Sequence, residues 1–128
     1  MMDAIDVVCA VITNDQGQVF IGKRKSMVSD GIWEFPGGKV ENNETKEQAL
    51  IREIQEELNV EIVIDAFLMD FIDSAFEPQV HVFAFQAHIV SGTMEFHAHK
   101  EGKWIPVSDV FRYKFQEADH CLLCFLQS

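Results

Sequence analysis

The segment from Thr45 to Leu58 constrains the fold and the chemistry of this chain more than any other. Thr45 with Gln48 three residues later has the pattern of a helix capping box, and Asn59 can take the left-handed conformation that ends a helix. The spacing of the apolar residues then predicts an amphipathic helix. Its expected buried face consists of Leu50, Ile51, Ile54 and Leu58.

Three acidic residues of the same helix, Glu53, Glu56 and Glu57, fall on a stripe about 100° wide beside that apolar face. Like charges three and four residues apart repel one another by a few tenths of a kcal/mol per pair. A divalent cation with oxygen ligands would turn this repulsion into attraction. The plainer interpretation is a solvated acidic helix face, and the residues around the helix decide between the two.

The rest of the chain alternates strand-like and turn-like segments. Strands are expected over residues 3–13 and 19–23, joined as a hairpin by the turn 14–17, and over 32–35, 61–73, 80–91 and 102–107. Pro36-Gly37-Gly38 should end the third strand, and residues 25–31 form the longest loop. Ser108 can cap one helical turn. A closing helix is expected over 117–126, with its apolar face at Ala118, Leu122 and Phe125. The pattern predicts one α+β domain over residues 1–128, with a mixed sheet.

Composition limits the partners of such a domain. The 128 residues include 10 basic and 21 acidic ones, a net charge of −11, and 48% are apolar. A chain this acidic repels duplex DNA and anionic membranes, so a phosphate-bearing partner needs a bridging cation. No apolar run is long enough to span a membrane. Three cysteines without a pairing framework, including a lone Cys121-x-x-Cys124, favour a reducing cytoplasm over a zinc site.

The residues around the acidic helix follow a specific pattern. Gly38 is followed after five residues by Glu44, and seven more lead to Arg52-Glu53-Ile54-Gln55-Glu56-Glu57-Leu58-Asn59-Val60. This pattern resembles the Nudix box, with Asn59 in place of the final glycine. The run WEFPGGKVE over residues 33–41 is similar to the MutT-type branch of that family. The resemblance implies an α/β/α sandwich with a mixed sheet, the Nudix helix and a C-terminal helix.

The same resemblance implies a Mg²⁺- or Mn²⁺-dependent hydrolase that splits a nucleoside triphosphate into the monophosphate and pyrophosphate. It assigns metal binding to Glu53, Glu56 and Glu57, with Glu53 also a candidate base. It adds the backbone carbonyl of Gly37 as a metal ligand. Glu101 is the expected extra ligand or base, with Glu95 as its alternative. His97 and His99 are poor candidates, because hard cations prefer oxygen.

Two further groups of residues follow from the box and its surroundings. Arg52 is expected to orient a carboxylate, and Glu44 to brace the loop onto the helix. For the substrate, Arg24 resembles a phosphate-binding arginine, with Lys39 as a neighbour and Lys23 and Lys25 as either phosphate contacts or solvated loop residues. Phe35 and Phe76 would stack on or frame a base, unless they are core residues. Asp119 would read the base edge, and as an ionised group it only accepts hydrogen bonds.

The base itself stays open at this stage. Asp119 suits the N7–H of an oxidised guanine as well as the amino group of cytosine or adenine. The run over residues 33–41 favours oxidised purines such as 8-oxo-dGTP, and the alternative is a CTP-type pyrophosphohydrolase. An enzyme for nucleotide sugars or dinucleotides is less favoured, because such proteins usually carry extra elements. A non-catalytic nucleotide-binding module is disfavoured by the intact glutamates. A cytoplasmic monomer or homodimer is expected.

Overall fold

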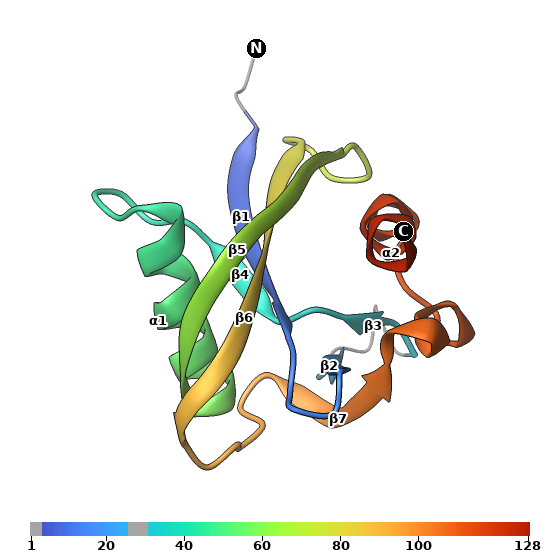
Figure 1. The fold of residues 1–128 in the computed structure, drawn as a ribbon. Coiled ribbons are helices and arrows are strands. Elements are labelled where there is room, and N and C mark those ends of the chain that lie inside the picture. The colour runs from blue at the N-terminus through green and yellow to red at the C-terminus, as the bar shows by residue number, and fades with distance from the viewer. Residues whose placement is uncertain (1–3, 26–30) are drawn as a thin grey trace.

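The alternating burial of β1 (Ile5–Ile12) sets the layers of the fold. The computed structural model describes residues 4–25 and 31–128. Val8, Ala10 and Ile12 face one hydrophobic cluster, which contains the apolar face of α1 (Lys46–Leu58). Cys9 and Val11 face the other cluster, which contains Leu122 and Leu123 of α2 (His120–Gln127). Because successive strand residues point to opposite faces, one central sheet separates two cores, with α1 and α2 on either side (Figure 1).

The central sheet is mixed, as the sequence predicts. Its strand order is β4 (Gly37–Lys39), β1, β6 (Val80–Gly92) and β5 (Val60–Asp73), with β1 and β6 parallel and the other pairs antiparallel. A second, antiparallel sheet has the order β3 (Trp33–Glu34), β2 (Gln18–Arg24) and β7 (His99–Pro106). Two 3₁₀ turns, η1 (Val107–Arg112) and η2 (Glu117–Asp119), lead into α2. The predicted α+β class is confirmed.

The main helix begins and ends where the sequence predicts. The Thr45 side chain accepts a hydrogen bond from the Gln48 amide, the Gln48 side chain accepts one from the Thr45 amide, and Asn59 has a φ of 59°. One predicted core residue is wrong: Ile51 is 40% exposed. Ala49 is buried in its place, because the sheet meets the helix on the side of Leu50 and Ile54.

Four other local predictions need correction. The expected hairpin of β1 and β2 is only one bridge long, Thr13 to Val19, because the two strands join different sheets. β3 does end before Pro36, as predicted, but Gly37 and Gly38 are not only a break: they begin β4 in the other sheet. Ser108 does not cap η1, whose first residue follows Pro106. Phe125 is 44% exposed, because α2 packs through Leu122 and Leu123.

Two further expectations concern a loop and a membrane-spanning helix. The predicted loop over residues 25–31 falls mainly on residues 26–30, which lie outside the described residues. Within the described ranges, no helix combines the length and the apolar character needed to cross a membrane.

Gly37 allows β4 to pair with β1 at close range. A Cβ at this position would overlap the carbonyl oxygen of Val8 and crowd the backbone of Cys9. We therefore expect Gly37→Ala to lower the free energy of unfolding by at least about 3 kcal/mol, measured by urea denaturation. Gly17→Ala is the matched control: φ is +73° but nothing lies within 4 Å of the new Cβ, so the cost is about 1 kcal/mol. Equal costs at the two sites would contradict this account.

Candidate active site

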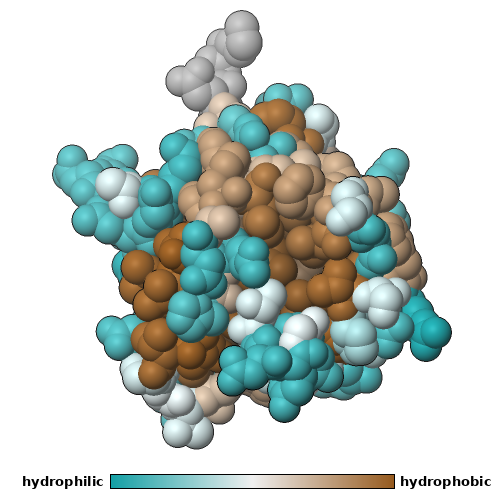
Figure 2. Space-filling view, in the orientation of Figure 1, coloured by the Kyte–Doolittle hydropathy of each residue, from teal (hydrophilic) through white to brown (hydrophobic). Residues whose placement is uncertain are grey.

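A cleft of about 580 Å³ extends from the acidic edge of α1 to the segment that leads into α2. Its walls come from β1, β3, β4 and the facing ends of β5 and β6. Figure 2 shows hydrophobic residues gathered over the middle of the face that Figure 1 presents, with hydrophilic residues along its borders. The cleft therefore joins an apolar wall to charged groups. Its ionisable lining residues are Arg24, Glu34, Lys39, Glu53, Glu57, Asp73 and Asp119, together with Cys9.

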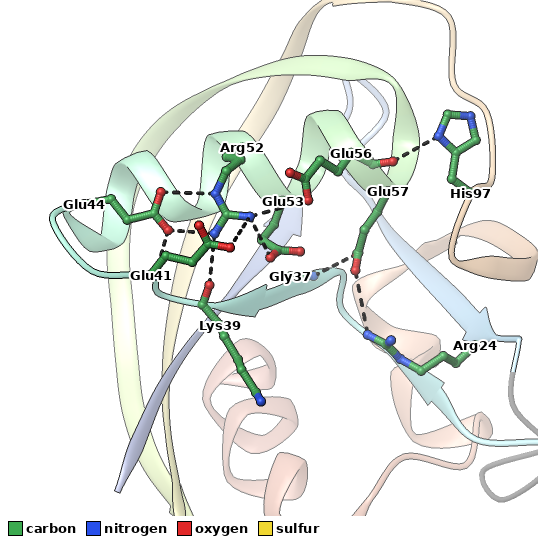
Figure 3. Close-up of polar contacts among 10 residues, drawn as sticks. All are labelled: Arg24, Gly37, Lys39, Glu41, Glu44, Arg52, Glu53, Glu56, Glu57 and His97. Carbon is green, nitrogen blue, oxygen red and sulfur yellow. Dashed lines mark hydrogen bonds and ion pairs between the residues drawn. The ribbon is translucent and has the colours of Figure 1, made fainter. Parts of the chain in front are cut away.

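Two glycines bring the backbone of β4 against the acidic edge of α1. The amide of Gly37 donates a hydrogen bond to Oε1 of Glu57 at 3.3 Å (Figure 3). A Cβ on Gly38 would overlap the carboxylate of Glu53. Gly38 is therefore required by packing against α1, and the segment Pro36-Gly37-Gly38 also breaks β3.

Arg52 contacts several acidic residues in and just before α1. Its guanidinium lies 2.6 Å from Glu44, 3.0 Å from Glu53 and 3.4 Å from Glu56, and it donates to the carbonyl oxygen of Lys39 at 3.1 Å (Figure 3). The hydrogen bond to Glu44 raises the pKa of Arg52 and lowers the pKa of Glu44. Arg52 thus contacts carboxylates and backbone, and Glu44 ties the loop before α1 to the helix.

The three glutamates of the helix have different surroundings. Glu53 and Glu57 are largely buried and line the cleft, whereas the side chain of Glu56 is 59% exposed. Burial raises the pKa of Glu57 to about 7, although His99 and Arg24 oppose the shift. Since a bound cation favours the charged form of a carboxylate, a metal ion would reverse this rise.

The donors at this edge suit a hard divalent cation. Glu53 and Glu57 offer carboxylate oxygens, and both residues line the open cleft. Among the described residues, no group of three or more His, Cys, Asp or Glu side chains is arranged as a complete metal site. A site with few protein oxygens and an open cleft beside them fits Mg²⁺, because this ion keeps several of its water ligands.

Arg24 lies where the acidic end of the cleft, at Glu57, meets the part lined by Trp33 and Glu34. Its Nε is 3.0 Å from both carboxylate oxygens of Glu34, and its Nη2 is 2.9 Å from Glu34 and 3.8 Å from Oε2 of Glu57. Oε2 of Glu34 also lies 2.9 Å from Nε2 of His99. Burial alone would raise the pKa of Glu34, but the hydrogen bonds from His99 and Arg24 lower it.

Sequence reasoning gave no role to Glu34. The available signal was a charged residue inside the short apolar segment of residues 32–35. The sequence suggests His99 only as a poor candidate for metal binding, and the structure buries it beside Glu34.

The far end of the cleft carries two carboxyl groups, Asp119 and Asp73. Asp73 is 6% exposed and accepts a hydrogen bond from the amide of Ala75. Burial, with smaller contributions from Asp73 and Glu34, raises the pKa of Asp119 to about 7. Asp73 was missed because an acidic residue at the end of a strand looks like an ordinary exposed turn residue.

Aromatic side chains accompany these carboxyl groups. Phe35 is buried and its ring packs 5.3 Å from that of Phe115, measured between centroids. Phe76 lines the cleft and is 47% exposed. Phe35 can therefore form only a fixed wall, while Phe76 has a face available for stacking.

Several predicted residues lie away from this cleft. Glu101 is not among its lining residues and pairs with Lys23 at 3.6 Å and Lys103 at 4.0 Å. Glu95, its alternative, contacts Asn59 and His97. The amide of Lys25 bonds to the carbonyl of Ala98. Cys121 and Cys124 are exposed free thiols.

Lys39 lines the cleft, but only its backbone takes part in the contacts around Arg52. In Figure 3 its carbonyl faces Arg52 while its side chain extends in the opposite direction. The side chain is therefore available to a ligand in the cleft.

Comparison with known proteins identifies the family. Residues 4–124 match the NUDIX domain. The chain belongs to the NUDIX domain family. This confirms the resemblance drawn from the spacing between Gly38 and Val60. Members of the family generally use a divalent metal ion.

Individual relatives confirm the MutT-type branch. The chain is 32% identical to a CTP pyrophosphohydrolase of Escherichia coli strain K12, over 95% of this chain and 90% of the relative. It is 44% identical to an 8-oxo-dGTP diphosphatase of Proteus vulgaris, over 57% of this chain and 71% of the relative. The structure of a MutT NUDIX hydrolase from Burkholderia pseudomallei superposes with a TM-score of 0.77, at 28% identity and 98% coverage of both chains.

The raised pKa of Asp119 has a consequence for stability. Folding moves this pKa from about 3.9 to about 7, so the folded chain binds more protons between these values and loses stability as the pH rises through them. Asp119→Asn removes the cost, and its stabilising effect should grow from pH 4 to 7 and then level off, reaching at most roughly 4 kcal/mol. Chemical denaturation at pH 5 and pH 8 measures the difference.

Asp15→Asn, in an exposed turn, is the control and should change stability little at either pH. If Asp119→Asn had the same effect on stability at both pH values, Asp119 would not be a group whose charge is suppressed by folding.

Proposed function

We propose that this protein is a nucleoside triphosphate pyrophosphohydrolase, which converts a nucleoside triphosphate and water into the monophosphate and pyrophosphate. The observation that carries the proposal is the layout of one cleft. Buried glutamates lie at one end, a guanidinium lies part-way along, and an apolar pocket with carboxyl groups lies at the other end. A nucleotide has the matching order of polyphosphate, sugar and base.

The polyphosphate end requires a cation, because the glutamates and the phosphates are both negative. Mg²⁺ or Mn²⁺ held by Glu53, Glu57 and the carbonyl of Gly37, with Glu56 at the exposed edge, would neutralise the phosphates and lower the pKa of a bound water. Glu53 is the candidate base, and Arg52 orients its carboxylate from 3.0 Å. Arg24, with Lys39, would contact the phosphates. Glu101 has no place in this scheme, because it does not line the cleft.

The base end favours bases that offer N–H donors. An ionised Asp119 accepts from the N7–H of an oxidised guanine or from an amino group, and a protonated Asp119 can also donate to a carbonyl such as guanine O6. With a pKa near 7, both forms are present at neutral pH. Asp73 adds a second acceptor nearby, and Phe76 offers a stacking face.

We assign 8-oxo-dGTP as the first candidate substrate, because this donor pattern and the similarity to 8-oxo-dGTP diphosphatases agree. CTP is the second candidate, favoured by the relative that matches 95% of the chain. We place the enzyme in the cytoplasm, where free thiols such as Cys121 and Cys124 persist and damaged nucleotides would otherwise enter DNA.

A substrate panel tests the assignment directly. Purified protein with Mg²⁺ is incubated with the four canonical deoxynucleoside triphosphates, CTP, 8-oxo-dGTP and 2-hydroxy-dATP, and both pyrophosphate and monophosphate are quantified. The expected result is equal release of both products, fastest for 8-oxo-dGTP or CTP. Release of single phosphates from every substrate would contradict the reaction proposed.

Glu53 should be essential for turnover. Glu53→Gln removes a charge from the metal end and the candidate base, so we expect kcat to fall by two or more orders of magnitude with the circular dichroism spectrum unchanged. Glu47→Gln is the matched control, because Glu47 lies in the first turn of the same helix and is exposed. Near-normal turnover of Glu53→Gln at saturating Mg²⁺ would place the chemistry elsewhere.

Asp119 should control the choice of base more than the rate. An Asn at this position both donates and accepts but never carries charge, so Asp119→Asn should change the ratio of kcat/KM for 8-oxo-dGTP and CTP by about tenfold. The ratio is measured in competition assays with both substrates present. An equal loss on every substrate would show instead that Asp119 has a structural role.

A further inference from the structure

His99 is a buried polar residue that the chemistry described so far does not use. It begins β7, pairs with Arg24 across the sheet at the register shift in β2, and is 0% exposed. A Cβ at Gly22 would lie 2.6 Å from the His99 ring, so the glycine makes the space for it. The sequence therefore provides a fitted position for an imidazole behind the cleft.

Stability alone does not explain an imidazole at this position. Nδ1 of His99 is buried and has no hydrogen-bond partner among the described residues. An unsatisfied buried polar atom costs on the order of 1–3 kcal/mol, whereas an aromatic hydrocarbon ring of similar shape would carry no such cost. The other ring nitrogen, Nε2, makes the contact that can account for the residue, 2.9 Å to Oε2 of Glu34.

Glu34 is held from two sides. On the cleft side, Nε and Nη2 of Arg24 form a two-pronged contact with its carboxylate, and on the inner side His99 contacts Oε2. Two-pronged contacts fix the plane of a guanidinium. The plane of Arg24 is thus set by Glu34, and the position of Glu34 is set by His99. This orientation leaves Nη2 of Arg24 3.8 Å from Oε2 of Glu57, at the edge where the polyphosphate would lie.

We propose that His99 is a positioning residue, which holds the carboxylate of Glu34 and through it fixes the guanidinium of Arg24 toward the phosphates of the substrate. This inference rests on the proposed function for the part that involves substrate. The part that concerns the orientation of Arg24 does not depend on it.

The test compares His99→Phe, which keeps the ring and removes the donor, with His99→Gln, whose amide nitrogen can occupy the place of Nε2. His99→Phe should raise KM for the triphosphate about tenfold and leave kcat within threefold, because Arg24 contributes to substrate binding in the ground and transition states alike. His99→Gln should restore most of the affinity. In an Arg24→Gln background, His99→Phe should raise KM no further.

His88→Phe is the matched control, because it breaks a similar His–carboxylate pair with Asp65 on the exposed surface of β5 and β6. It should leave KM unchanged. If His99→Phe lowered the melting temperature without altering KM, or if its effect and that of Arg24→Gln were additive, the proposal would be wrong.

A second readout needs no activity. The chain has three arginines, Arg24, Arg52 and Arg112, so their Nε–H groups give three resolvable signals in a ¹⁵N–¹H spectrum. The Arg24 signal, assigned by its loss in Arg24→Lys, should be protected from exchange in the wild type and in His99→Gln, and exchange-broadened in His99→Phe. An unchanged signal in His99→Phe would overturn the proposal. A wild type that hydrolyses no triphosphate but shows this pattern would refute the proposed function alone.

Discussion

The close approach of β4 to the acidic edge of α1 is the contact on which the site depends. Gly37 has the carbonyl of Val8 where a Cβ would stand, and Gly38 has the carboxylate of Glu53 there. A larger residue at Gly37 would push β4 from β1, and one at Gly38 would push β4 from the helix or the carboxylate from the cleft. Since β4 also pairs with β1 in the central sheet, the position of the glutamates is tied to the core of the fold.

Charge is distributed around this contact so that the site is stable before a ligand arrives. The chain carries a net charge of −11, yet two of its three arginines are committed to carboxylates at the cleft. Arg52 joins Glu44, Glu53 and Glu56 at one side, and Arg24 joins Glu34 at the other. Burial nevertheless raises the pKa of Glu57 to about 7, although Arg24 and His99 oppose the shift. A divalent cation at this edge would complete the neutralisation.

The sequence predicts well whatever depends on neighbours along the chain. The limits of α1 were predicted correctly because the capping box and the left-handed Asn59 act within one turn of the helix. Contacts between distant segments were not predicted. Glu34 and His99 are 65 residues apart, and no local pattern indicates that β3 and β7 bring them together. The predicted burial of Phe125 and Ile51 was wrong for a related reason. Periodicity gives the width of an apolar face but not the direction from which the sheet approaches.

Each end of the cleft holds a carboxyl group with a raised pKa, but a ligand would change the two groups differently. Burial raises the pKa of both Glu57 and Asp119 to about 7. At the α1 end a cation would stabilise the carboxylate and return Glu57 to its charged form. At the other end Asp73 and Glu34 are themselves acidic, and both favour the protonation of Asp119. Burial can therefore suit the proposed charged metal ligand at one end and, 62 residues later in the chain, a neutral carboxyl group that could donate a hydrogen bond to a base.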